Sequence, residues 1–332
     1  MKKLRIWLIL FLLFALVIAA IVYVNSTKST LTPNPTPIPT TTATAAATLT
    51  PSPAPTVPTY TPPSTPTPTP APSQGTLPQL QVHYIDVGQG DSILIDLGET
   101  EVLIDGGDRA HTVVPYLPQY IDGPLEAMVA THPHEDHIGG LIAVLEAFKV
   151  EKIVLNGDTS TSQTYGDFMT RVNAEGAEVK VVRRGDTIVA GNLTLKVLSP
   201  IAPLTQDTNE NSIVLMLSYG KEDFLFMGDA GKEAEAGMIA GNLLQHSEIL
   251  KVGHHGSSSA TSQAFLNIVR PEVAIYMAGV GNPYGHPYPG TISALQAIGA
   301  KVYGTDTCGT ITVTTDGEGY TITQAGTKTQ SQ

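Results

Sequence analysis

A cluster of metal-ligand side chains follows a short apolar segment and strongly constrains how this 332-residue chain can fold. Residues 127–130 are typical of a buried strand, and the sequence His-Pro-His-Glu-Asp-His follows one residue later. Imidazole and carboxylate groups are common ligands of divalent metals such as zinc. In an extended loop, His132 and His134 would point the same way and bind one ion, while Asp136 and His137 would face a second position. The spacing predicts a site for two metal ions. The alternative is a surface turn that binds metal adventitiously.

The N-terminal residues 1–25 contain three basic residues, followed by a continuous apolar run from residue 6 to residue 24. A run of this length can span a bilayer as a helix. Bulky residues occupy the positions where a cleavage site requires small ones, which favours an uncleaved transmembrane anchor over a signal peptide. Because the basic residues precede the run, we expect a single-pass membrane protein whose remaining chain is extracytoplasmic. If the N-terminus were cleaved, the protein would be secreted.

Residues 26–78 are rich in Pro and Thr and lack the apolar content that a core needs. This composition predicts a disordered, extended linker that holds a domain away from the membrane. A ligand for a partner module is the alternative. Residues 79–328 are then the globular domain, which is long enough for a hydrophobic core without disulfides. Cys308 is the one cysteine of the chain, so neither an intrachain disulfide nor a cysteine-based metal site is possible.

The acidic charge belongs to the globular part. The whole chain has a net charge of −12, whereas residues 1–78 contain four basic residues and no Asp or Glu. The remainder therefore has 30 acidic and 18 − 4 = 14 basic residues, a net charge of −16. Such a domain lacks the broad basic surface on which nucleic-acid binders rely. A role on DNA or RNA would have to depend on a local patch and on the metals.

Apolar segments of the globular part follow strand and helix patterns in turn. Strands are expected at residues 81–87, 92–97, 101–104, 127–130, 152–155, 178–182, 193–198, 212–219, 224–227, 248–252, 273–277, 301–303, 310–314 and 320–323. Helices are expected at residues 141–148, 166–174, 232–240, 263–269 and 291–298. Clustered strands with helices between them indicate an α/β protein in which two sheets are covered by helices.

Further residues of metal-ligand type follow other predicted strands. They are Asp105, Asp229, the pair His254 and His255, and His286. Loops at strand ends often carry functional residues, so we expect these side chains to gather with the histidine cluster at one edge. Asp229 suits a carboxylate that two ions share. Asp91 and Asp306 are interpreted as turn residues, with a supporting role behind the ligands as the alternative.

Together these features resemble the metallo-β-lactamase superfamily, and most closely the metallo-hydrolase domain at the C-terminus of bacterial competence DNA-uptake channel proteins. The resemblance covers almost all of residues 80–315 and implies an αββα four-layer sandwich with two metals at its edge. One apolar segment replaces the multi-span channel, so we expect a stand-alone, membrane-anchored form that is no DNA translocator. The similar motifs are residues 85–92 (IDVGQGDS), the histidine cluster, 211–212 (NS), 226–229 (FMGD), 251–257 (KVGHHGS) and 282–287 (NPYGHP).

The resemblance also implies roles for individual residues. The metal ligands would be His132 and His134 for the first ion, Asp136 and His137 for the second, Asp229 as the bridge, and His255 or His254 to complete the second site, with His255 preferred. The catalytic residues would be Asp136, Asp105 and His286. Asp105 would orient the cluster, and His286 would act as a proton donor or oxyanion partner. A structural role beside a proline is the alternative for His286. Many superfamily members have a further histidine before the bridging aspartate, which residues 208–212 lack, so the first ion would have fewer protein ligands.

These observations predict an extracytoplasmic metal-dependent hydrolase that uses a hydroxide bridging two divalent ions, Zn or Mn. A phosphodiesterase or nuclease is the leading hypothesis. One alternative is a hydrolase of cell-envelope phosphodiesters, such as phosphocholine or teichoic-acid groups. Another is a non-catalytic wall-binding or DNA-binding module. The expected partners are the membrane, through the N-terminal helix, and a polymeric phosphodiester substrate, either DNA or a cell-wall polymer. The sequence indicates no obligate protein partner.

Overall fold

The computed structural model describes residues 77–109 and 113–326. The predicted anchor at residues 1–25 and nearly all of the predicted linker at 26–78 lie outside these residues. Within the two described ranges, no helix is long and apolar enough to cross a membrane.

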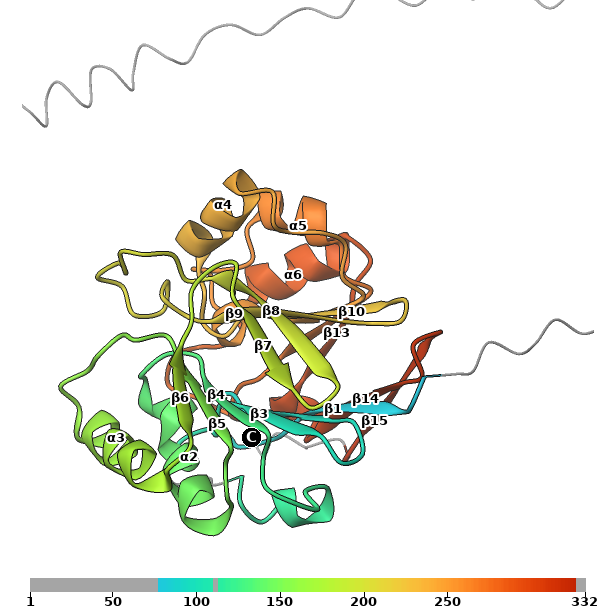
Figure 1. The fold of residues 1–332 in the computed structure, drawn as a ribbon. Helices are drawn as coiled ribbons and strands as arrows, with labels where there is room; N and C mark the ends of the chain where they lie inside the picture. The colour runs from blue at the N-terminus through green and yellow to red at the C-terminus, as the bar shows by residue number, and fades with distance from the viewer. Residues whose placement is uncertain (1–76, 110–112, 327–332) are drawn as a thin grey trace, which may run out of the picture. The chain divides into compact units, whose positions relative to one another are not determined.

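Two mixed β-sheets pack face to face, and helices cover their outer faces (Figure 1). The first sheet has the strand order β15-β14-β1-β2-β3-β4-β5-β6, and the second has the order β13-β12-β11-β10-β9-β8-β7. The first sheet consists of β1 (Leu80–Tyr84), β2 (Ile93–Asp96), β3 (Glu101–Ile104), β4 (Ala127–Ala130), β5 (Lys152–Leu155), β6 (Glu178–Val181), β14 (Ile311–Thr315) and β15 (Tyr320–Gln324). The second consists of β7 (Thr187–Ala190), β8 (Leu193–Ser199), β9 (Val214–Tyr219), β10 (Glu222–Phe226), β11 (Ile249–Lys251), β12 (Val273–Tyr276) and β13 (Lys301–Gly304). This architecture confirms the predicted αββα sandwich.

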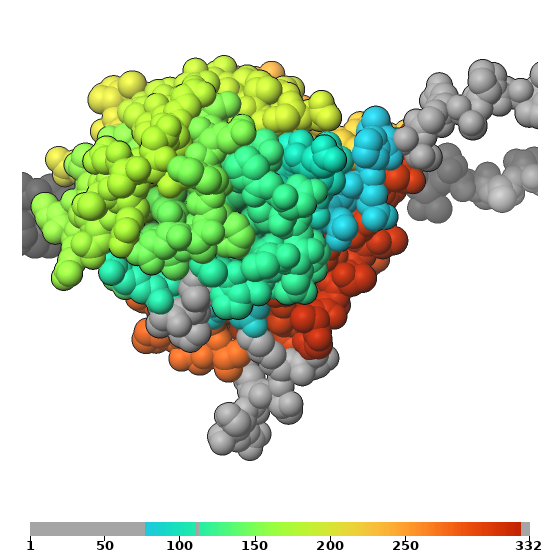
Figure 2. Space-filling model, turned by 60° about the horizontal axis from the view of Figure 1, so that its bottom comes forward, coloured from blue at the N-terminus to red at the C-terminus, as the bar shows by residue number. Residues whose placement is uncertain are grey.

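The helices form the two outer layers of the sandwich (Figure 1). The first sheet is covered by α2 (Glu135–Ala147) and α3 (Gln163–Glu175), and the second by α4 (Lys232–Ala240), α5 (Gln263–Val269) and α6 (Pro289–Ala297). Shorter helical segments are η1 (Leu117–Gln119), η2 (Gly253–Gly256) and α7 (Thr305–Cys308). The space-filling view shows the earliest and latest described residues, in blue and red, side by side, because β1 pairs with β14 (Figure 2).

The central strands are apolar on both faces because each face packs against a different layer. In β4, Ala127 and Val129 point into the core between the sheets, whereas Met128 and Ala130 point toward α2 and α3. A strand buried on both faces has no polar alternation, which explains the continuous apolar run before the histidine cluster. The rigid core thus fixes the end of β4, from which His132 follows.

The start of α2 differs from the prediction. The sequence pattern predicts a helix from Leu141, but α2 begins at Glu135, so Asp136 and His137 lie in its first turn and not in an extended loop. Carboxylates in a first turn interact favourably with the positive end of the helix dipole. The helix has a glycine at position 140 because a Cβ there would overlap the carbonyl oxygen of Gly106. This close approach joins the ligand-bearing turn to the loop after β3.

Four further elements were not predicted. They are the edge strand β7 and the short helical segments η1, η2 and α7. The predicted first strand, residues 81–87, ends earlier, at Tyr84. Each of these elements is only three to five residues long, too short to show a clear hydrophobic period.

Candidate metal centre

Loops and helix turns from both sheets bring the predicted ligand residues to one edge of the sandwich. In the first sheet, β3 is parallel to β4, and in the second β10 is parallel to β11 and β11 to β12. The carboxyl ends of such strands meet at the same edge, where sites of α/β proteins form. Asp105 follows β3, His132 follows β4, Asp229 follows β10 and His255 follows β11. The two sheets therefore both contribute to one cluster.

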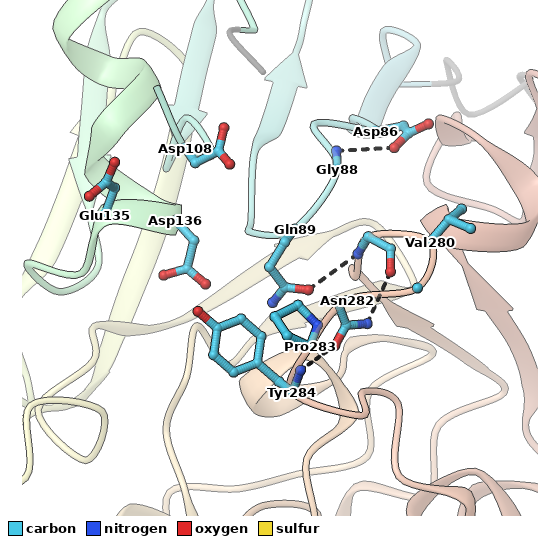
Figure 3. Close-up of a pocket in the computed structure, with 12 residues that line it drawn as sticks. Asp86, Gly88, Gln89, Asp108, Glu135, Asp136, Val280, Asn282, Pro283 and Tyr284 are labelled. Carbon is cyan, nitrogen blue, oxygen red and sulfur yellow. Dashed lines mark hydrogen bonds between the residues drawn. The ribbon is translucent and has the colours of Figure 1, made fainter. Parts of the chain in front are cut away.

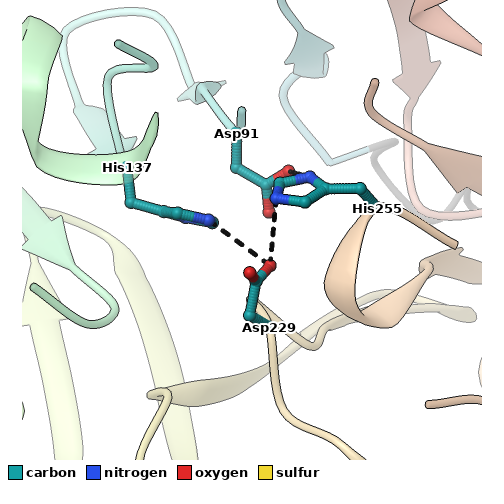
Figure 4. A group of neighbouring side chains, drawn as sticks. All are labelled: Asp91, His137, Asp229 and His255. Atoms are coloured by element: carbon teal, nitrogen blue, oxygen red, sulfur yellow. Dashed lines mark ion pairs between the residues drawn. The ribbon is translucent and has the colours of Figure 1, made fainter. Parts of the chain in front are cut away.

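One group of ligand atoms comes from His137, His255, Asp229 and Asp91, and these atoms all lie within 4.8 Å of one another (Figure 4). Both histidine Nε2 atoms lie 3.4 Å from Oδ1 of Asp229. The two Nε2 atoms and Oδ1 of both aspartates are buried and have no hydrogen-bond partner among the described residues. Such atoms are costly to bury unless a ligand satisfies them. Asp136 adds a further carboxylate, with Oδ2 3.3 Å from Nε2 of His255.

A second group consists of His132, His134 and Asp229. Nε2 of His132 lies 3.0 Å from Nδ1 of His134 and 3.8 Å from Oδ2 of Asp229. Two ligand nitrogens of one tetrahedral zinc ion lie roughly 3.3 Å apart, so the two rings are close to a chelating arrangement. Asp229 turns Oδ1 toward the first group and Oδ2 toward the second, which is the arrangement that a bridging carboxylate requires. The donor set of histidines and aspartates thus fits divalent metal ions.

Asp105 orients histidines of both groups from behind. It is fully buried, and its left-handed backbone (φ 57°) directs the carboxylate into the cluster. Oδ2 lies 2.8 Å from Nδ1 of His137 and accepts a 2.7 Å hydrogen bond from the hydroxyl of Thr131. The Thr131 hydroxyl oxygen lies 3.1 Å from Nδ1 of His132 and can accept its proton. In this assignment both rings keep Nε2 free for a metal, which is the usual function of such supporting carboxylates.

The paired histidines of η2 point to different sides of Asp229. Nδ1 of His255 donates to the carbonyl oxygen of Met277 at 2.9 Å, which leaves Nε2 directed at Asp229 and Asp136. His254 lies 2.9 Å from the Ser259 hydroxyl through Nδ1, and its Nε2 is 3.8 Å from Oδ2 of Asp229. His255 is therefore placed to join His137. His254 faces the side of Asp229 where His132 lies and where the expected further histidine is missing from the sequence.

The charges of the cluster compensate one another in the absence of metal. Burial alone would lower the pKa of His137 and of His255, but Asp229 and a second aspartate outweigh it and raise the pKa of both rings. Burial would likewise raise the pKa of Asp229 and Asp136, but His255 and His137 hold the pKa of both carboxyls below its usual range. The pKa of His132 is well below its ordinary value, chiefly through burial and then through the charge of His137.

Lys251 was not predicted as part of the centre, whereas for Asp91 a supporting role behind the ligands was the alternative to its interpretation as a turn residue. Lys251 ends β11 fully buried, and its Nζ lies 2.5 Å from Oδ2 of Asp91 and donates to the carbonyl oxygen of Val252. Oδ1 of Asp91 lies 3.3 Å from Nδ1 of His255. Burial would raise the pKa of Asp91, but Lys251 lowers it. A lysine at the end of an apolar strand and next to the histidine pair was the available signal. Asp306, interpreted as a turn residue, lies in α7.

His286 stands at the outer rim of the cluster, on the loop after β12. Its ring centroid is 5.5 Å from that of His254 and 6.3 Å from that of His255. Asn282 shapes this loop: its side-chain oxygen accepts from the backbone N–H of Tyr284 and of His286. Burial, then the neighbouring histidines, lower the pKa of His286. The ring is therefore neutral near pH 7 and can donate only one hydrogen bond.

A pocket of about 760 Å³ adjoins the cluster (Figure 3). Asp136 belongs both to the pocket wall and to the cluster. The remaining walls come from the loop after β1, the loop after β3, the first residue of α2 and the loop after β12. A substrate could therefore lie in this pocket with its reacting group at the ligand atoms.

Residues 85–280 match the family described as the metallo-beta-lactamase superfamily. The chain is 31% identical over 253 residues to ComE operon protein 3 of Bacillus subtilis, an alignment that covers 70% of this chain and 32% of that protein. It is 32% identical over 232 residues to competence protein ComA of Neisseria gonorrhoeae, covering 68% of this chain and 31% of the other. The chain thus spans about a third of the length of these curated relatives.

Among solved structures, the metallo-beta-lactamase fold protein YhfI from Bacillus subtilis is similar. The superposition covers 68% of this chain and 95% of that protein, with a TM-score of 0.47 and 13% sequence identity.

Proposed function

Because the chain belongs to the metallo-β-lactamase superfamily, we propose that it is a metal-dependent phosphodiesterase. The observation that carries the proposal is the convergence of four buried ligand atoms that lack hydrogen-bond partners among the described residues, from His137, His255, Asp229 and Asp91. Burying so many unsatisfied polar atoms at one point is unfavourable for a purely structural cluster. Their identity and separation suit divalent cations, and Asp136 connects them to an open pocket.

His132 and His134 would hold one ion, and His137 and His255, together with the neighbouring carboxylate of Asp136, would hold the other. Asp229 belongs to both groups and would be shared between the ions. When bound, the ions supply Lewis-acid polarisation of a phosphoryl oxygen and lower the pKa of a water molecule.

The chain's own residues then orient the reactants for hydrolysis. The water oxygen forms a bond to phosphorus while the bond from phosphorus to the leaving alcohol breaks, and the water proton passes to the leaving oxygen. Neutral His286 is positioned at the rim to donate a hydrogen bond to the phosphoryl group. Asp105 keeps His137 and His132 in the tautomers that leave Nε2 free.

The cellular location is part of the same proposal. The apolar run at residues 6–24, which lies outside the described residues, supports a single-pass anchor in the cell membrane. The Pro/Thr-rich residues 26–78 would then hold the domain at 79–328 outside the cytoplasm. A polymeric phosphodiester, DNA or a cell-wall polymer, is the substrate class that such a location and site would suit.

The test is hydrolysis of bis(p-nitrophenyl) phosphate by the purified full-length chain with added Mn²⁺ or Zn²⁺. We expect turnover with at least one of these ions and loss of turnover to background in Asp136→Ala, because this variant removes a ligand at the pocket. Asp167→Ala is the matched control, since Asp167 lies on the outer helix α3 and pairs with Arg109 at the surface. No turnover in the presence of bound metal would contradict the proposal and leave a non-catalytic binding module.

A further inference from the structure

A buried ion pair lies directly beside the candidate metal centre. Nζ of Lys251 is 2.5 Å from Oδ2 of Asp91 and donates to the carbonyl oxygen of Val252 at 2.9 Å. Lys251 is 0% exposed and Asp91 is 1% exposed. Because Lys251 is inaccessible, it cannot contact a substrate. Its positive charge can influence the metal centre only through the carboxylate that it holds.

The pair connects the two sheets at the residues that would bind metal. Asp91 belongs to the loop after β1 in the first sheet, whereas Lys251 ends β11 in the second and is followed by η2, which carries His255. The backbone N–H of Asp91 donates to the carbonyl oxygen of Asp136 at 3.1 Å, and the carbonyl oxygen of Asp91 accepts from the N–H of Gly107 at 2.8 Å. The position of Asp91 is therefore fixed relative to ligand residues of both sheets.

Asp91 contacts the His255 ring at the nitrogen that would not bind metal. Its Oδ1 lies 3.3 Å from Nδ1 of His255, whereas Nε2 of that ring lies 3.4 Å from Oδ1 of Asp229 (Figure 4). A carboxylate beside the second nitrogen is a common support for a metal-binding histidine. Asp105 stands in the same relation to His137, with Oδ2 2.8 Å from Nδ1. Each of these two histidines thus has a carboxylate beside its Nδ1.

A different role is chemically available to Asp91. Its carboxylate offers a ligand atom within 4.8 Å of those of His137, His255 and Asp229, so it could itself bind the ion (Figure 4). An anionic ligand in contact with a metal ion offsets part of the ion's positive charge. Lys251 opposes this role because it binds the other carboxylate oxygen, Oδ2, in the protein interior.

We propose that Lys251 is a positioning residue that holds the carboxylate of Asp91 beside Nδ1 of His255 and keeps it from binding the ion. The inference rests on the proposed function, because it concerns the ion that His137 and His255 would hold. The ligands assigned to that ion already include the carboxylates of Asp136 and Asp229. Exclusion of a third carboxylate would preserve the Lewis acidity that a bound ion supplies to hydrolysis.

The test is the visible absorption of Co²⁺ bound to the full-length, metal-depleted chain, because high-spin Co²⁺ absorbs less strongly as its number of ligands rises. Lys251→Met removes the ammonium group from a long side chain, so Asp91 should bind the ion and lower the absorbance. Addition of Asp91→Asn to this variant should restore the spectrum of the unaltered chain. Lys221→Met is the matched control, since it breaks a surface pair with Glu318 and should leave the spectrum unchanged.

The double variant Asp91→Asn/Lys251→Met decides the question even if Lys251→Met does not fold. Removal of one partner leaves a buried charge unpaired, whereas removal of both charges does not. In the double variant we expect the same number of Co²⁺ ligands as in the unaltered chain. The Co²⁺ affinity, measured by titration, should fall about tenfold or more because His255 loses its supporting carboxylate.

Three results would overturn the positioning role, and they differ in what else they affect. A rise in Co²⁺ absorbance in the double variant would show that Asp91 is a ligand in the unaltered chain. Unchanged spectra and affinities in the variants of this pair would show that it only stabilises the fold. Both results leave the proposed function intact. No Co²⁺ binding by the unaltered chain would contradict the metal-dependent function and, with it, this inference.

Discussion

At the scale of single residues, protons and metal ions would compete for the same histidines of the candidate centre. The pKa values of His137 and His255 are raised by Asp229 with Asp105 or Asp91, in spite of burial. Both rings therefore favour the protonated form more than a free imidazole does when no metal is bound. A metal ligand must be the neutral imidazole, so an ion that binds has to displace these protons.

We therefore expect metal binding to release protons and to strengthen as the pH rises. Because the pKa of both rings is raised, a metal ion that both rings ligate should release protons on binding. Calorimetric titration of Mn²⁺ or Zn²⁺ in two buffers of different ionisation enthalpy counts them. Affinity should increase from pH 6 to pH 8, and an affinity that stays constant would show that neither ring is protonated before binding.

The residues of the candidate centre could be predicted only in part from the sequence. The histidine cluster, Asp229 and Asp105 follow apolar strands, so their convergence could be predicted from strand ends alone. Asp91 and Lys251 could not, because an aspartate in a Gly-rich turn and a lysine at a strand end are ordinary on a surface. Only the packing of the loop after β1 against the end of β11 turns them into a buried pair.

At the scale of elements, the first turn of α2 is the least predictable part of the site. Its first residues carry ligands and not apolar side chains, so the hydrophobic period becomes visible only from Leu141 onward. The helix reaches this position because Gly140 packs directly against Gly106 in the loop after β3. The approach is so close that there is no room for a Cβ on Gly140. Backbone bonds from Gly106 N to His137 O, 2.8 Å, and from Gly140 N to Gly107 O, 2.9 Å, hold the contact.

Gly140→Ala should therefore disturb both stability and metal binding. The new Cβ would overlap the carbonyl oxygen of Gly106, so the free energy of unfolding should fall by about 1–3 kcal/mol, and His137 should move away from Asp105. Gly166→Ala is the matched control: it lies in α3 with open space around a Cβ, and it should stabilise by about 0.5–1 kcal/mol. Urea unfolding and metal titration of both variants measure this. Equal effects would exclude the close approach as the cause.

At the scale of the whole molecule, the candidate centre joins the two halves of the sandwich. His132, His134 and His137 come from the first sheet, whereas Asp229 and His255 come from the second. The core between the sheets aligns them, and the fold class itself could be read from the order of strand and helix patterns. The number of strands at the sheet edges could not be predicted from the sequence, because β7 is short and half exposed.

Removal of metal should consequently weaken the whole domain. A ligand that binds only the folded state stabilises it by about 2.7 kcal/mol at a concentration of 100 times its dissociation constant. Chelation with EDTA should lower the midpoint of thermal unfolding, and re-addition of Mn²⁺ or Zn²⁺ should restore it. Asp229→Asn should show a much smaller response to EDTA. An unchanged midpoint in the unaltered chain would mean that no metal links the sheets.

The pairing of β1 with β14 has a kinetic consequence. Leu80 lies opposite Thr315, so a strand near the start of the domain is enclosed only by one near its end. A chain that emerges N-terminus first must leave β1 as an open edge until almost all of the domain has followed. Contacts this distant in sequence make folding slow, and an open apolar edge invites aggregation meanwhile. The first sheet can therefore close around β1 only after β14, near the end of the domain, is available.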